Sequence, residues 1–135
     1  MPYRYGRRSL DRLGTCHQYL QTLMLAVLED PECPLDVSIL CGHRTRDEQD
    51  AAYRRGTTQL QWPKSRHNSF PAMAVDAAPY VNGAVSWDWT HYHPLAAHIK
   101  AVWARLSAEG KVSGQLEWGG DWRSFKDGPH WQLEL

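Results

Sequence analysis

One segment limits the fold more than any other: Ala74-Val-Asp-Ala-Ala78, an apolar run with a carboxylate at its centre. The run is short, apolar and closed by Pro79, which predicts a buried strand. An unpaired ionised carboxylate in such a strand costs on the order of several kcal/mol. Asp76 therefore requires a cation, a metal ion or strong hydrogen-bond donors, and the fold must bring that partner to this strand.

The rest of the chain predicts helices packed with a small sheet. Apolar side chains recur at helical spacing over residues 9–29 (or 11–29) and 93–108. Thr45 and Glu48 have the spacing of a capping box, so we expect a third helix over residues 46–55 that stops at Gly56. Further strands are expected at residues 34–40, 115–118 and 129–133, with a polar loop at 57–68 and a turn at Asn82-Gly83. These elements predict an α+β fold with a small antiparallel sheet.

Length and charge narrow the class of protein. The 135 residues contain no linker or repeat, so we expect one catalytic domain, residues 1–135, without a separate cell-wall-binding domain. Fifteen basic and fifteen acidic residues cancel, which argues against nucleic acid or membrane as a general partner. The basic first eight residues are followed by no apolar run, so no signal peptide is expected. We expect a monomer that does not insert into membranes and stays where it is made.

The cysteines do not suggest a catalytic thiol. Cys16, Cys33 and Cys41 are odd in number and lack a CxxC spacing, so we expect three free thiols that serve packing, although one disulfide is possible. Cys41 and His43 lie two residues apart on an extended segment, which is poor geometry for a Cys–His pair.

Two histidines are candidate partners for Asp76. His67 lies nine residues upstream at the end of a polar loop, and His130 begins the last predicted strand. Two imidazoles and one carboxylate form a plausible ligand set for Zn²⁺, with a fourth position left for water. The spacing alone leaves open that they are ordinary polar residues, because the chain has no HExxH motif. His91 and His93 form a second, HxH candidate.

Three blocks resemble one family in the same order along the chain, from about residue 35 to residue 133. They are Cys41-Gly-His-Arg-Thr-Arg-Asp-Glu-Gln49, Ser65-Arg-His-Asn-Ser-Phe-Pro-Ala-Met-Ala-Val-Asp76, and Leu116-Glu-Trp-Gly-Gly-Asp-Trp122 followed by Asp127-Gly-Pro-His-Trp-Gln132. The second and third resemble the metal-binding motifs of the zinc D,D-carboxypeptidase and L-alanyl-D-glutamate endopeptidase family, and most closely its phage endolysin branch. The resemblance implies a hedgehog/D,D-peptidase-like fold.

The same resemblance implies roles for five residues. His67, Asp76 and His130 would bind zinc, Asp127 would be the general base, and Arg44 would lie over the substrate carbonyl or carboxylate. Glu117 is the alternative base.

The chain also departs from the family pattern at two positions. Phe70 stands where the family often has Gly and could reshape the cleft wall. His43 stands where it often has Tyr and is either a substrate contact or a packing residue.

The implied activity is that of a zinc-dependent peptidoglycan endopeptidase, an endolysin that hydrolyses the L-alanyl-D-glutamate bond of stem peptides and lyses the cell wall. One alternative is a D,D-carboxypeptidase acting on D-Ala-D-Ala termini, and another is a non-catalytic zinc or wall-binding module. The resemblance also implies that the protein waits in the host bacterial cytoplasm until the membrane is opened.

Overall fold

A computed structural model describes residues 3–135, and it has the α+β architecture predicted from the sequence. Met1 and Pro2, which begin the basic segment and the expected domain, lie outside the described residues. The helices are α1 (Arg7–Leu13), α2 (Gln18–Glu29), α3 (Arg46–Arg55) and α4 (Trp89–Ala108), with a 3-10 turn η1 (Gly119–Asp121). The strands are β1 (Asp36–Cys41), β2 (Ala74–Val81), β3 (Ala84–Val85), β4 (Gln115–Trp118) and β5 (His130–Glu134).

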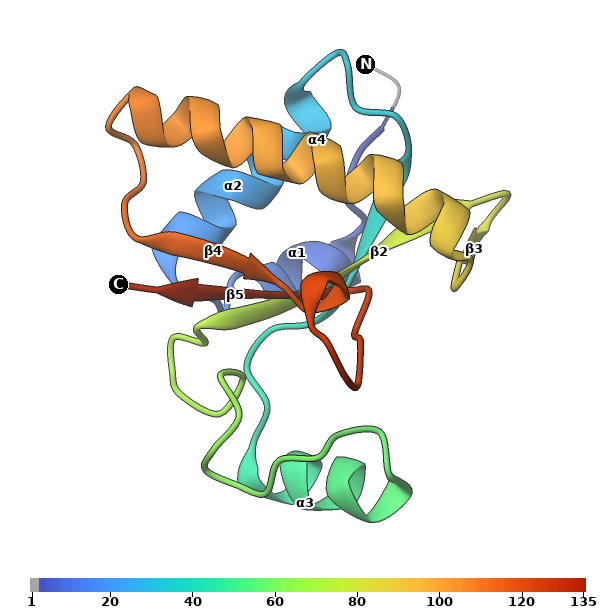
Figure 1. The fold of residues 1–135 in the computed structure, drawn as a ribbon, viewed down its shortest axis with the longest axis vertical. Helices are drawn as coiled ribbons and strands as arrows, with labels where there is room; N and C mark the ends of the chain where they lie inside the picture. Colours follow the sequence, from blue (N-terminus) through green and yellow to red (C-terminus); the bar gives the residue numbers. More distant parts are fainter. Residues whose placement is uncertain (1–2) are drawn as a thin grey trace.

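The strands form one antiparallel sheet in the order β1-β2-β5-β4, with β3 paired to β2. Helices α2 and α4 lie on one side of this sheet, α1 lies along the outer strand β1, and α3 stands apart from the sheet (Figure 1). Val75, Ala77, Trp131 and Leu133 are buried in one apolar cluster with the inner side chains of α2 and α4. Because side chains alternate along a strand, the residues between them point to the opposite face of the sheet.

That opposite face carries polar groups. Asp76 of β2 is paired with His130 of β5 on one side and with Cys41 of β1 on the other. The register between β1 and β2 shifts between Ile39 and Cys41, so that two residues of β1 oppose one residue of β2. The bulge keeps Ile39 in the core while it places Cys41 beside Asp76.

Three predicted boundaries were wrong. The helix expected over 9–29 is two helices, because the chain turns at Cys16, which forms a bridge to Ala72. Strand β2 continues through Pro79, which lies beyond the pairing with β5 and next to the short pairing with β3. Its carbonyl accepts a hydrogen bond from the Ser86 N–H at 2.8 Å, which requires no N–H from the proline.

Helix α4 starts at Trp89, earlier than residue 93, because Asp88 caps it by accepting a hydrogen bond from the Thr90 N–H at 2.9 Å. Among residues 3–135, no helix is both long and apolar enough to cross a membrane.

Candidate metal centre and catalytic cleft

The three residues proposed as metal ligands lie together on the polar face of the sheet. His67 comes from the loop between α3 and β2, Asp76 from β2 and His130 from the first position of β5. Nε2 of His67 and Nδ1 of His130 lie 3.2 Å and 3.4 Å from the same oxygen, Oδ1 of Asp76. Both histidines are buried and the Asp76 side chain is 15% exposed. Two ring nitrogens therefore face one carboxylate.

Each imidazole is fixed by an acceptor on its other nitrogen. Nδ1 of His67 lies 2.7 Å from the Gly42 carbonyl, and Nε2 of His130 lies 2.8 Å from Oε1 of Gln132. Because these oxygens only accept, a neutral ring keeps its proton there and has a free lone pair on the side of Asp76. Metal-binding histidines are oriented in this way. Gln132 was not predicted as part of the site, although a residue two positions from His130 on a strand shares its face.

The pKa values of His67 and Asp76 shift in opposite directions. Burial alone lowers the pKa of His67 and raises the pKa of Asp76, because it disfavours each charged form. The mutual attraction outweighs burial: Asp76 raises the pKa of His67 above its ordinary value, and His67 with His130 lowers the pKa of Asp76 well below its ordinary value. The cluster therefore favours a positive charge beside Asp76, which is a role that a metal ion can also fill.

Cys41 and Asp127 flank these residues on opposite sides. Ligand atoms of Cys41, His67 and Asp76 lie within 4.8 Å of one another, as do those of Asp76, Asp127 and His130. Cys16, Cys33 and Cys41 are free thiols, as expected. The expectation that Cys41 only serves packing overlooked its place opposite Asp76 on the neighbouring strand, which sequence could not reveal without the strand register.

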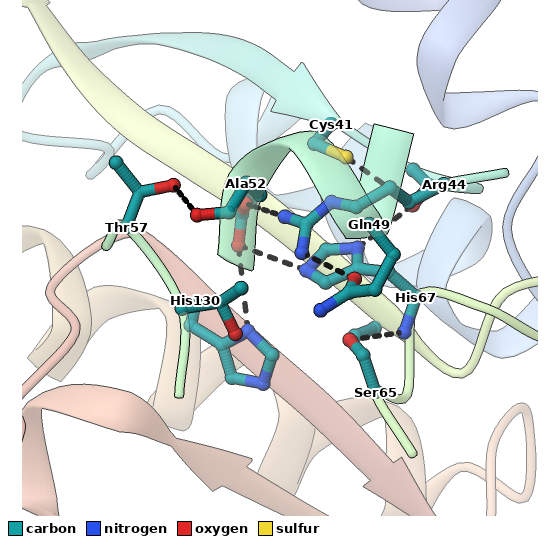
Figure 2. Close-up of polar contacts among 12 residues, drawn as sticks. Cys41, Arg44, Gln49, Ala52, Thr57, Ser65, His67 and His130 are labelled. Carbon is teal, nitrogen blue, oxygen red and sulfur yellow. Dashed lines mark hydrogen bonds and ion pairs between the residues drawn. The ribbon is translucent and has the colours of Figure 1, made fainter. Parts of the chain in front are cut away.

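Arg44 is held from both sides at the mouth of this cluster. Its guanidinium donates to Oε1 of Gln49 at 2.9 Å and lies 3.7 Å from Oδ2 of Asp76. Its backbone N–H donates to the His67 carbonyl at 2.8 Å, which ties the two segments together. Figure 2 shows Arg44, Gln49 and His67 gathered above His130. Gln49, which is fully buried, was not recognised from the sequence as part of the site.

Asp127 reaches the cluster from the loop between η1 and β5. Its N–H donates to the Gly119 carbonyl at 3.1 Å, and its carbonyl accepts from the His130 N–H at 3.3 Å. Gly119 is required here, because a Cβ would lie 2.4 Å from the Asp127 carbonyl oxygen. Burial raises the pKa of Asp127, the negative charge of Asp76 adds to the rise, and the neighbouring cations only partly offset it.

These groups open into a cleft with two walls. The loop at residues 57–67 forms one wall, and residues 122–129 with the start of β5 form the other. Trp122 lies in the second wall with its ring 5.1 Å from that of His130, and its Nε1 donates to Glu117 at 2.5 Å. Glu117 thus contacts the back of Trp122 and is not among the residues that line the cleft.

The other candidates lie elsewhere. Phe70 is 71% exposed and packs edge-on against His43 at 5.3 Å, and neither lines the cleft, so Phe70 does not reshape its wall. His91 contacts the Ser86 hydroxyl at 2.7 Å, and the His93 ring lies 5.7 Å from that of Trp118. Within residues 3–135 neither histidine belongs to a group that could hold a metal.

Comparison with protein families identifies relatives over nearly the whole chain. The family model described as phage L-alanyl-D-glutamate peptidase matches residues 1–133. The L-alanyl-D-glutamate peptidase of Escherichia phage T5 is 32% identical over 132 residues, which cover 94% of this chain and 87% of that protein. The peptidoglycan L-alanyl-D-glutamate endopeptidase CwlK of Bacillus subtilis is 33% identical over 107 residues, or 73% of this chain and 61% of that protein.

Comparison with solved structures agrees. The crystal structure of the Serratia marcescens L-Ala D-Glu endopeptidase ChiX matches with a TM-score of 0.77 and 30% sequence identity. The match covers 97% of this chain and 90% of that one. The likeness therefore includes the sheet, the helices and the segments that form the cleft.

Proposed function

The chain belongs to the phage L-alanyl-D-glutamate peptidase family, and from this premise we propose that it hydrolyses the L-alanyl-D-glutamate bond of peptidoglycan stem peptides with a bound zinc ion. The protein is a peptidoglycan endopeptidase. The three relatives named above are all L-alanyl-D-glutamate peptidases by name, which favours this bond over D-Ala-D-Ala. It also favours an enzyme over a non-catalytic wall-binding module.

The paired orientation of His67 and His130 carries the metal proposal. Both present a nitrogen to Asp76 Oδ1 while the other nitrogen is engaged by Gly42 or Gln132. Two imidazoles and one carboxylate are the ligand set of many catalytic zinc sites. We infer that His67, Asp76 and His130 are the ligands. A bound Zn²⁺ would supply a water of lowered pKa and polarise the scissile carbonyl.

Asp127 is the group best suited to move protons. Its carboxylate lies within reach of Asp76 and His130 and lines the cleft, and burial raises its pKa, which makes it a stronger base than an exposed carboxylate. In the proposed reaction Asp127 takes a proton from the attacking water. It then gives that proton to the amine of D-glutamate as the C–N bond breaks.

Arg44 is placed to stabilise negative charge on the substrate. Its guanidinium lines the cleft and is held by Gln49, so its orientation is fixed before substrate binds. The oxygen of the L-alanine carbonyl gains negative charge when water adds, and a fixed cation nearby lowers the energy of that state.

Metal analysis combined with product analysis tests the proposal. The purified protein should hold about one zinc per chain, and mass spectrometry of digested muropeptides should show new N-terminal D-glutamate. His67→Ala, Asp76→Ala and His130→Ala should each lose zinc and activity together, whereas His91→Ala should retain both. A ligand variant with full zinc content and full activity would remove that residue from the proposed site. Cleavage at D-Ala-D-Ala alone would refute the proposed bond.

A further inference from the structure

A second cleft adjoins the catalytic cleft at Asp127, which is among the residues that line both. The remaining lining of the second cleft comes from the start of α4 and from the loop before β5: Trp87, Trp89, Tyr92, Lys126, Gly128 and Pro129. A substrate bound across Asp127 would extend into it.

The second cleft presents aromatic surface to solvent. Trp87 is 65% exposed and Trp89 is 38% exposed, although both are large apolar side chains. Trp89 cannot move freely, because its ring packs 5.6 Å from Tyr92 and 6.2 Å from Trp118. Trp118 is itself tied to the Asp127 loop, since its Nε1 donates to the Gly128 carbonyl at 2.7 Å. Trp89 is therefore packed on a support next to the proposed base, and Trp87 lines the same cleft.

The two clefts differ in charge. The catalytic cleft has two guanidinium groups in its lining: Arg44, which lies 3.7 Å from Asp76, and Arg66, which forms an ion pair with Glu134. The second cleft has one cation, Lys126, and its ammonium is engaged by the Trp122 carbonyl at 2.6 Å. Charge complementarity therefore assigns the acidic side of a substrate to the catalytic cleft and a neutral side to the aromatic cleft.

The proposed substrate has this asymmetry. On the leaving side of the scissile bond stands D-glutamate with its carboxylate. On the other side L-alanine is joined through a lactyl group to N-acetylmuramic acid, a sugar with apolar C–H faces, hydroxyls and an acetamido group. Indole rings offer a flat apolar face for the C–H faces of the sugar and an N–H donor for its hydroxyls and acetamido group.

We propose that Trp87 and Trp89 form a subsite for the muramic acid sugar next to the scissile L-alanine. This inference rests on the proposed function. It assigns the aromatic cleft to the sugar side of the substrate and predicts that the enzyme prefers peptides still attached to muramic acid.

Two substrates that differ only in the sugar test the subsite: N-acetylmuramoyl-L-Ala-γ-D-Glu-L-Lys, and the same tripeptide capped by a lactyl group. The zinc-loaded parent should cleave the muramoyl substrate with the higher kcat/KM. Trp87→Ala, which removes a largely exposed side chain, should lower kcat/KM on that substrate roughly five- to tenfold and leave the lactyl substrate unchanged. Phe70→Ala is the matched control, because Phe70 is an aromatic side chain that is 71% exposed and lines neither cleft.

The outcomes separate this inference from the proposed function. If the parent cleaves both substrates and Trp87→Ala leaves the ratio of the two kcat/KM values unchanged, the subsite is refuted while the proposed function stands. If Phe70→Ala lowers the ratio as much as Trp87→Ala, the effect is not specific to this cleft and the subsite is refuted as well. Cleavage of neither substrate at the L-Ala–D-Glu bond would overturn both.

Discussion

At the scale of single residues, two carboxylates compete for the role of base, and their surroundings differ. Asp127 is partly buried beside Asp76 and His130 and lines the cleft. Glu117 is exposed, and its carboxylate accepts a hydrogen bond from the indole of Trp122. Of the two carboxylates, only Asp127 is grouped with the proposed metal ligands, where it could exchange protons with a water held by them. Substituting each carboxylate in turn therefore tests which of them is the base.

We expect Asp127→Asn to keep its zinc and lose activity by about 10²-fold or more, because the amide is nearly isosteric but cannot accept a proton. Glu117→Gln is the matched comparison and should lose far less, since an amide oxygen can still accept the bond from Trp122. Steady-state cleavage of a stem peptide, together with zinc content, measures both. If Glu117→Gln were the inactive variant with zinc bound and Asp127→Asn remained active, the assignment of the base would be wrong.

The residues that sequence could identify are those with unusual chemistry for their surroundings. Asp76 stands out in an apolar strand, and its resemblance to a known motif pointed to His67 and His130. Gln49 and Gly119 gave no such signal, because their importance lies in contacts with Arg44 and with Asp127, which come from other segments. The ligand set and the base remain proposals.

At the scale of secondary structure, the sequence predicted the bounds of an element whose interactions are local. It did not predict a break that depends on a contact with a distant residue. Helix α3 has the predicted bounds, with a complete capping box between Thr45 and Glu48 and a left-handed Gly56 at its end. All of these interactions lie within a dozen residues of sequence. The break between α1 and α2 depends on the bridge from Cys16 to Ala72, which no local pattern encodes.

The capping box gives a prediction with a definite sign in pH. The Thr45 N–H donates to the Glu48 carboxylate at 2.8 Å and lowers the pKa of Glu48. A carboxylate with a lowered folded-state pKa stabilises the fold above its unfolded-state pKa, and this stabilisation is lost as the pH falls through the folded-state pKa.

We therefore expect Glu48→Ala to lower the free energy of unfolding by about 1 kcal/mol at neutral pH. The difference from the parent should shrink as the pH falls from about 5 to about 3. Urea denaturation of both proteins over this range measures it. A difference that stays constant with pH would show that the charge of Glu48 contributes nothing to the cap.

At the scale of the whole molecule, the fold was predictable as a class and the cleft was not. The apolar patterns and the order of elements predicted helices on a small antiparallel sheet, and ChiX has the same arrangement. The cleft forms where residues 57–67 meet residues 122–129 and the start of β5. The first two segments are irregular, and their paths are set by packing rather than by periodicity. The expectations of a single domain, a monomer and storage in the host cytoplasm remain predictions.

The separation of α3 from the rest of the fold has a consequence for local unfolding. The helix stands away from the sheet and is joined to it by residues 42–45 and 57–73 (Figure 1). His67 lies in the second connection, whereas Asp76 and His130 lie in the sheet. Segments with little packing against the core open most readily, so α3 should exchange its amide hydrogens faster than β2. A metal held by ligands from both parts would link that opening to metal release.

Zinc should therefore slow amide exchange in α3 if the helix cannot open without releasing the ion. At a free zinc concentration of about 100 times the dissociation constant, the slowing should be roughly 100-fold. Hydrogen exchange followed by mass spectrometry, with and without zinc, measures this peptide by peptide. In His67→Ala the effect of zinc on α3 should vanish. If zinc left the exchange of α3 in the parent unchanged, α3 would open while the ion stays on the sheet.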